Sequence, residues 1–311
     1  MIRYVLAAGA LKAFSLNGAS KRLYRWMGNA IGSRRRVANM DIAAYISRGD
    51  LLVDLCNKYS AVRDGQQSLE IGTGWMHWFA IYLRLFVDGE IATMDVWDNR
   101  QFDALRAAFT NLETAFVARG APTRACANLR SLLAATSFAD VYDRLKLSYV
   151  ISPDGSLAMF GDGSRDCIFS FHVLEHVPHA DVARLCADTY RVLKPGGFAI
   201  HQIGIDDHLS HYDRSCSPKE YLRYSDRRWK WFFENEVQYV NRIQMSEWLL
   251  AFGAVGFSVR ETLVESVDIS GLRIAPMYRS YSDEDLACTI LTLVLQKPIA
   301  VTHPPSSGTR N

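Results

Sequence analysis

A strand, a glycine turn and a helix that follow one another without a linker constrain the fold more than any other feature. The predicted strand covers residues 67–71, and the turn that follows contains Gly72 and Gly74. The predicted helix covers residues 75–87 and is apolar nearly all round, which is typical of a buried helix. A buried strand that turns directly into a buried helix begins a strand–helix–strand unit, so the chain should form a parallel sheet covered by helices.

The rest of the chain continues this alternation. Further strands are expected at residues 91–96, 147–152, 167–171, 198–203, 257–263 and 287–296. Helices are expected between them at 39–60, 100–145, 180–194 and 245–252. The last two strands lack a full helix between them, which favours antiparallel pairing. The prediction is therefore an α/β fold with a doubly wound, seven-stranded, mostly parallel sheet and helices on both faces.

Composition and local patterns divide the chain into three parts. Residues 1–62 are expected to form an N-terminal helical extension that covers the main domain. Residues 63–297 form that domain, and residues 204–244 are an insertion that acts as a lid. The proline- and serine-containing tail at 298–311 is expected to be disordered.

The N-terminal forty residues carry eight Lys or Arg residues and no acidic residue. Their apolar stretch is too short to span a bilayer. Two interpretations remain open: a helical extension packed on the core, or a basic amphipathic arm that contacts an anionic membrane or the substrate.

Charge and cysteine usage limit the partners and the compartment. The formal net charge of the 311-residue chain is +2, which argues against a strong binder of nucleic acid. The six cysteines form no C-x-x-C pair, so neither a disulfide framework nor a zinc site is expected. A reducing cytoplasm fits this cysteine usage best.

Acidic residues stand where three predicted strands end. Glu70 and Asp95 close the first two strands, and Asp154 follows the third. Ligands of α/β sheets bind at these carboxyl ends, and the acid after the second strand suits a ribose diol. Gly72 and Gly74 let the backbone approach a ligand closely, and the following helix N-terminus suits a carboxylate.

A dinucleotide does not fit this turn. The dinucleotide pattern needs a third glycine, and here Gly74 is followed by Trp75, Met76 and His77. The bulky Trp75 side chain would crowd a pyrophosphate. A glycine pair alone is equally consistent with any tight strand-to-helix turn.

Four segments in this order together resemble the class I S-adenosylmethionine (SAM)-dependent methyltransferase family across residues 66–296. The segments are Leu69–Gly74, Met94–Val96, Pro153–Ser156, and Asp166–Val177 running into Leu193–Gly197. The resemblance implies SAM as the cofactor and methyl transfer as the activity. The long stretch between Asp95 and Asp154 and the bulky residues after Gly74 depart from many relatives.

The resemblance also implies roles for single residues. Gly72 and Gly74, with Thr73 between them, would flank the methionine moiety of SAM, and Glu70 would orient its amino group. The implied ribose ligand is Asp95, the implied adenine ligand is Asp154, and the residues implied to line the site where the sulfonium meets the substrate are Ser170, Phe171 and His172.

Histidines after the fourth and fifth strands are the candidate bases. Methyl transfer needs a base only when the acceptor is a poor nucleophile, and histidine has a pKa near neutrality. His208 and His211 lie in a polar loop and are favoured, whereas His172 and His176 are also candidates and His176 can equally pack the turn. The expected substrate contacts are Tyr212, Trp75 and Arg242.

No metal site is expected from the sequence. Ubiquinone-type O-methyltransferases carry two glutamates and a histidine in the loop after the fourth strand. This chain has Glu175 and His176, but His172 stands where the first glutamate would align. A group of Asp207, His208 and His211 is better explained as a solvated loop.

The sequence thus predicts a SAM-dependent methyltransferase for a small natural-product, lipid or glycan-type acceptor. A non-methylating SAM enzyme, such as one that cyclises the cofactor, and an RNA-modifying methyltransferase are the alternatives. The aromatic and basic residues of 204–244 suit a lid, and they also suit single-stranded nucleic acid. The sequence does not identify the acceptor atom that is methylated (O, N or C) or the oligomeric state.

Overall fold

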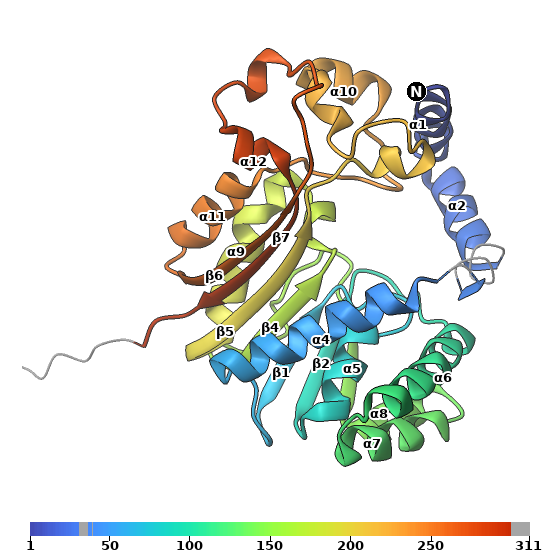
Figure 1. Ribbon diagram of the computed structural model, residues 1–311, viewed down its shortest axis with the longest axis vertical. Coiled ribbons are helices and arrows are strands. Elements are labelled where there is room, and N and C mark those ends of the chain that lie inside the picture. The colour runs from blue at the N-terminus through green and yellow to red at the C-terminus, as the bar shows by residue number, and fades with distance from the viewer. Residues whose placement is uncertain (31–36, 39, 300–311) are drawn as a thin grey trace, which may run out of the picture.

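A seven-stranded sheet forms the centre of the molecule (Figure 1). The computed structural model describes residues 1–30, 37–38 and 40–299. The strand order across the sheet is β3-β2-β1-β4-β5-β7-β6. The strands are β1 Gln67–Ile71, β2 Glu90–Asp95, β3 Leu147–Ile151, β4 Arg165–Phe171, β5 Leu193–Gly204, β6 Ser258–Ser266 and β7 Cys288–Gln296.

Strands β1 to β5 pair in parallel, and β7 runs antiparallel to both β5 and β6. The predicted doubly wound α/β sheet and the antiparallel last pair are therefore confirmed. The strand order reverses between β1 and β4, which is where open α/β sheets bind ligands.

Helices cover both faces of the sheet, because central strands such as β4 and β5 are apolar on both sides (Figure 1). One face packs against α4 Ile42–Tyr59, α5 Trp78–Phe86, α6 Phe102–Arg119, α7 Thr123–Leu133 and α8 Phe138–Leu145. The other face packs against α9 Val182–Val192 and α11 Met245–Ala254.

A third apolar cluster joins the N-terminus to the insertion. Helix α1 (Ile2–Phe14) buries Tyr4, Ala8 and Leu11 against residues of the insertion that include Trp229. Helix α10 (Asp226–Phe232) lies beside α1, and helix α2 (Gly18–Ala30) runs from α1 along the side of the molecule (Figure 1). Of the described residues of the predicted extension, α4 packs on the sheet, whereas α1 and α2 contact the insertion.

Several element boundaries differ from the prediction, and two of these differences have a clear physical reason. The helix expected from Trp75 begins at Trp78, because Gly74 (φ 66°) and His77 (φ 52°) adopt left-handed conformations that a right-handed helix excludes. The strand expected from Phe198 begins at Leu193, which already pairs with Arg165 of β4 before a register shift. The residues predicted to stop the helix, 194–197, therefore lie in a bulge of β5 between its pairing with Arg165 and its pairing with Cys167.

Most of the tail that the sequence predicts to be disordered lies outside the described residues. Across the part of the chain that the structure describes, no helix is both long enough and apolar enough to cross a membrane.

Candidate functional site

A cavity of about 630 Å³ opens at the carboxyl ends of the strands beside the point where strand order reverses. Its walls come from the turn after β1, the ends of β2 and β3, the loop after β4, and α9. The residues are Ile71, Gly72, Met94, Asp95, Val96, Pro153, Asp154, Gly155, His172, Val173, His176, Val177, Pro178, Asp181, Arg184 and Leu185. Three of the predicted cofactor ligands, Gly72, Asp95 and Asp154, therefore share one cavity with His172 and His176.

The turn after β1 is held in place by buried contacts. Gly72 has φ 70°, and a Cβ there would lie 2.4 Å from Val173 Cγ2, so the position requires glycine. Glu70 is buried, and its Oε2 accepts hydrogen bonds from the Thr73 hydroxyl (2.6 Å) and the Ala80 amide (3.3 Å). Burial raises the pKa of Glu70 to about 8, against the opposing effect of these hydrogen bonds. The Glu70 carboxylate thus stabilises the turn through hydrogen bonds on its buried side.

Asp95 and Asp154 stand at the cavity wall with different electrostatics. Asp95 accepts hydrogen bonds from the amides of Gly74 (2.9 Å) and Val96 (2.7 Å), and burial nevertheless raises its pKa. The pKa of Asp154 is lowered, because its carboxylate accepts from the Ser156 amide and the Ser152 hydroxyl. Both carboxylates keep lone pairs for a further donor.

Ser170 and Phe171 do not reach the cavity. The Ser170 hydroxyl is buried and lies 2.8 Å from His201 Nδ1, and Phe171 stacks on Phe79 with ring centroids 4.1 Å apart. Both residues belong to β4, whose two faces are covered by helices. His172, one residue beyond the strand, is the first to line the cavity.

His172 holds a left-handed backbone conformation with φ 55°. For a non-glycine residue this costs about 1–3 kcal/mol and is tolerated mainly at functional sites. Its Nδ1 lies 3.4 Å from Oε1 of Glu175, which is in the 3-10 helix η1 (Leu174–His176). The loop after β4 therefore presents an imidazole at the cavity and a carboxylate behind it.

The loop after β5 brings further histidines to the same edge. His208 and His211 are in the 3-10 helix η3 (His208–Tyr212), and the His208 ring centroid lies 5.0 Å from that of His176. His211 Nε2 lies 2.7 Å from Asp206 Oδ2, and this hydrogen bond raises the pKa of His211. Burial lowers the pKa of His208 to about 4.

Asp207 does not join these histidines. Its Oδ2 accepts a 2.6 Å hydrogen bond from the Tyr4 hydroxyl of α1, and its Oδ1 accepts from the Leu209 amide. Burial raises the pKa of Asp207 to about 7. The acid beside His208 and His211 is Asp206, so Asp207 is not available for the metal group weighed from the sequence.

The three predicted substrate contacts are dispersed. The Tyr212 hydroxyl donates to Gln238 (3.1 Å), and Trp75 packs against the core beneath the glycine turn. The Arg242 guanidinium is buried, pairs with Asp226 at 2.7 Å and donates to the Tyr278 hydroxyl. Arg242 therefore stabilises the insertion and lies outside the cavity.

Sequence reasoning did not single out two residues of the site. Val173, which lies within the quoted segment Asp166–Val177, fills the space opposite Gly72. Arg184 of α9 belongs to no quoted segment and donates to the backbone carbonyl of Asp154 (2.9 Å). Asp206, which directly precedes the acid considered for a metal group, pairs with His211.

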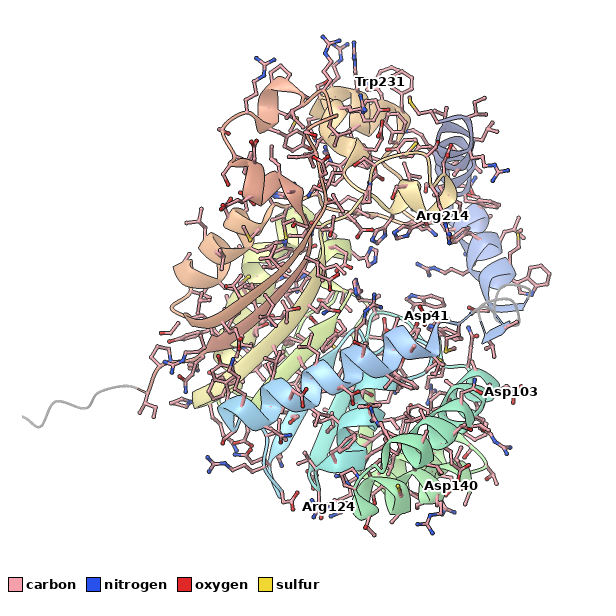
Figure 2. The ribbon with its side chains drawn as sticks, viewed as in Figure 1. Asp41, Asp103, Arg124, Asp140, Arg214 and Trp231 are labelled. Atoms are coloured by element: carbon pink, nitrogen blue, oxygen red, sulfur yellow. The ribbon has the colours of Figure 1, made fainter. Side chains whose placement is uncertain are left out.

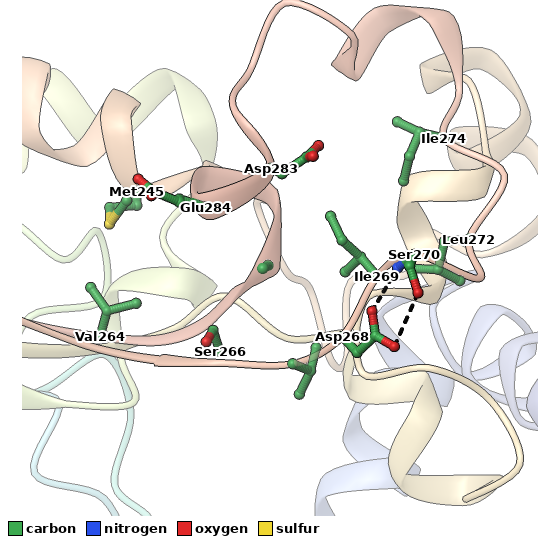
Figure 3. Close-up of a pocket in the computed structure, with 12 residues that line it drawn as sticks. Met245, Val264, Ser266, Asp268, Ile269, Ser270, Leu272, Ile274, Asp283 and Glu284 are labelled. Carbon is green, nitrogen blue, oxygen red and sulfur yellow. Dashed lines mark hydrogen bonds between the residues drawn. The ribbon is translucent and has the colours of Figure 1, made fainter.

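A second hollow of about 790 Å³ lies beside β6 and the helix α12 (Asp283–Ala287) (Figure 3). Asp268, Asp283 and Glu284 contribute to its lining, and Asp268 accepts hydrogen bonds from Ser270 (Figure 3). None of the residues at the carboxyl ends of β1, β2 and β4 lines it. The predicted cofactor ligands are therefore not associated with this larger hollow.

Comparison with known proteins gives one family match. Residues 69–201 match the sequence model of a methyltransferase domain. No curated protein matches the chain in sequence.

Solved structures of similar fold are distant. A protein assigned as a sarcosine dimethylglycine methyltransferase from Galdieria sulphuraria is 13% identical, with 81% of this chain and 86% of that chain covered and a TM-score of 0.47. Phosphoethanolamine N-methyltransferase 2 from Haemonchus contortus, in complex with SAM, is 14% identical, with 80% and 52% covered and a TM-score of 0.46. A SAM-dependent methyltransferase from Methanosarcina mazei is 17% identical, with 78% and 97% covered and a TM-score of 0.43.

Proposed function

We propose that this chain, which carries at residues 69–201 a methyltransferase domain of the class I SAM-dependent family, methylates a small-molecule acceptor. One observation carries the proposal. The cavity at the switch point is lined by Asp95 and Asp154, at or after the ends of β2 and β3, and by His172 and His176 of the loop after β4. Its volume of about 630 Å³ is in the range of small-molecule sites, roughly 300–1,000 Å³.

We assign the nucleoside half of SAM to the end with the carboxylates. Asp95 would accept hydrogen bonds from the ribose hydroxyls, and Asp154 would accept from the adenine amino group. The methionine half would lie along the Gly72–Gly74 turn, beside the N-terminus of α5. This placement directs the sulfonium towards the loop after β4, where the histidines begin.

The acceptor would enter between that loop and the insertion. Within the insertion, a smaller hollow of about 340 Å³ is lined by residues that include His211 and Arg214. A guanidinium at this place suits an acceptor that carries a carboxylate or phosphate. SAM supplies an electrophilic methyl group, and the residues of the chain align the acceptor and exclude water.

We assign the removal of a proton from a hydroxyl acceptor to His211, oriented by Asp206. His211→Asn should lower kcat by about 10²–10⁴-fold, the usual contribution of a positioned base. The base acts when neutral, and its pKa is raised by Asp206, so activity should rise with pH through a pKa above about 6.5. Asp206→Asn removes the carboxylate and should move that rise to lower pH while lowering kcat. An unchanged pH profile in Asp206→Asn would contradict the assignment.

The acceptor class can be tested before the acceptor is known. The 311-residue chain is incubated with SAM alone, with SAM and a bacterial small-molecule extract, and with SAM and total RNA, and S-adenosylhomocysteine release is measured. We expect release with the extract only. Turnover of SAM alone would indicate cofactor chemistry without methyl transfer, and release with RNA would replace the small acceptor by RNA.

We propose that the N-terminal helices also contact an anionic membrane near the acceptor entrance. Ile2 and Leu6 of α1 and Trp26 of α2 are exposed although apolar, and Trp231 of α10 extends the same end of the molecule (Figure 2). Exposed apolar groups among basic residues favour interfacial binding. Ile2→Ser/Leu6→Ser should reduce co-sedimentation with phosphatidylglycerol vesicles, whereas Leu250→Ser, at an equally exposed leucine of α11, should not. Equal sedimentation of both variants would remove this contact from the proposal.

We further propose a reducing compartment. All six cysteines lie in the described part of the chain and are unpaired, which supports this proposal.

A further inference from the structure

Glu175 is a buried acid whose carboxylate oxygens have no hydrogen-bond partner among the described residues. The residue is 1% exposed, although it is one position from the cavity-lining His176. A buried carboxylate is costly unless it is paired or hydrogen-bonded, or binds a metal ion. The nearest cationic candidate in the structure is His172, whose Nδ1 is 3.4 Å from Oε1 and is charged only when protonated.

Two imidazoles stand beside this carboxylate. Glu175, His176 and His208 each offer one ligand atom, and these atoms all lie within 4.8 Å of one another. They come from different loops, because β4 and β5 are parallel neighbours whose carboxyl ends meet at one edge of the sheet. Small side-chain rotations would bring three such atoms around one ion.

A hydrogen bond to the backbone fixes His176 in the tautomer whose Nε2 can bind a metal ion. Its Nδ1 is 2.6 Å from the backbone carbonyl oxygen of Tyr239, so Nδ1 must carry the proton and Nε2 keeps its lone pair. Metal-binding histidines almost always donate their other ring N–H in this way, to a carbonyl or a carboxylate.

Gly204, at the end of β5, keeps space open for the carboxylate. A Cβ at this position would lie 2.8 Å from Glu175 Oε1 and 3.2 Å from both His172 Nδ1 and Asp206 Oδ1. Asp206 Oδ1 is also 3.8 Å from His208 Nε2. A second carboxylate therefore borders the group and can support a ligand or an additional positive charge.

We infer that Glu175, His176 and His208 bind a divalent transition-metal ion at the acceptor end of the cavity. Two imidazoles and one carboxylate are a donor set typical of Zn²⁺, Mn²⁺ or Fe²⁺, whereas Mg²⁺ and Ca²⁺ prefer oxygen ligands alone. Three protein ligands leave a coordination position open. An oxygen of the acceptor would take that position. This role of the acceptor rests on the proposed methyl transfer, whereas binding of the ion does not.

The sequence predicted no metal because the candidate ligands were considered one loop at a time, with Glu175 and His176 in one group and His208 in another. His208 follows a different strand, and its distance from Glu175 is set by the pairing of β4 with β5. The ligand set also excludes His172, which the alignment had placed in a ligand position.

Metal binding by the purified 311-residue chain tests the inference directly. The protein is treated with a chelator, exchanged into buffer, and titrated with ZnCl₂, MnCl₂ and MgCl₂ by calorimetry. We expect one Zn²⁺ or Mn²⁺ per chain and no saturable Mg²⁺ binding. Co²⁺ in the same site should give visible absorption bands that report its nitrogen and oxygen ligands.

Glu175→Gln and His208→Asn should each weaken binding at least about 100-fold, because losing a ligand should cost no less than losing a supporting partner, which costs roughly 10–100-fold. His179→Asn, at an exposed histidine of the adjacent loop, is the matched control and should bind as the wild type does. Circular dichroism of each variant separates loss of ligation from loss of fold. Absence of binding by the wild type, or equal binding by a folded Glu175→Gln variant, would overturn the inference. If either result overturned metal binding while the wild type still transferred methyl groups, the proposed function would be unaffected.

Discussion

Gly72→Ala is expected to lower the free energy of unfolding by about 2–5 kcal/mol and to weaken SAM binding at least about tenfold. Two costs add. A left-handed conformation in a residue with a side chain costs roughly 1–2 kcal/mol, and overpacking costs roughly 1–3 kcal/mol. The new Cβ would lie 2.4 and 2.5 Å from the two γ-carbons of Val173. Val173 lines the cavity, so its displacement changes the surface that faces the cofactor.

Gly74→Ala is the matched control for this variant. Gly74 has φ 66°, nearly the same as Gly72, but among the described residues nothing lies within 4 Å of the position of its Cβ. It should therefore show only the conformational cost. Adding Val173→Ala to Gly72→Ala should restore part of the lost stability, because it removes the atoms that clash. Urea unfolding and calorimetric titration with SAM measure both effects. Equal losses in Gly72→Ala and Gly74→Ala would contradict the packing explanation.

Asp95→Ala is expected to weaken SAM binding by about 10²–10⁴-fold. Two hydrogen bonds to a charged acceptor contribute roughly 1.5–3 kcal/mol each, and about 1.4 kcal/mol corresponds to tenfold. The carboxylate also accepts from the Gly74 amide, so part of the loss would come from a looser turn. Asp95→Asn keeps the shape and should fall between the wild type and Asp95→Ala.

Asp98→Ala is the control for the Asp95 experiment. Asp98 belongs to the same loop but is half-exposed and pairs with Arg100 at 2.7 Å. Its removal should leave the dissociation constant of SAM, measured by calorimetry, within about twofold of the wild type, because changes at exposed ion pairs are worth little. A similar loss of affinity in both variants would show that a general charge effect, rather than ribose recognition, explains the result.

Much of the fold follows from local patterns. The apolar runs at β1, β2 and β4 and the glycines at 72 and 74 are sufficient to predict the strands and the first turn. The start of α5 was mispredicted because the left-handed conformation of His77 has no signal in its residue type. The start of β5 was mispredicted because a helix-stop segment can also pair with a neighbouring strand through a bulge.

Part of the candidate site was also predictable from local patterns. Residues at the end of a strand, such as Asp95 and His172, reach the cavity because the carboxyl edge is where ligands bind. Ser170 and Phe171 belong to the same motif, but β4 is covered on both faces and holds them in the core. Motif membership alone does not separate a cavity-lining residue from its neighbour inside the strand.

The sequence by itself determined the order of strands and helices, the glycine turn and the acids at the strand ends, because these depend on residues close together in the chain. Only the tertiary structure decided that Asp206, rather than Asp207, faces His211 and that the buried Arg242 guanidinium pairs with Asp226. It also decided that Glu175 and His208 meet. The reason is physical: the distance between side chains on different loops is fixed by the pairing of β4 with β5 and by the docking of α1, and local sequence encodes neither.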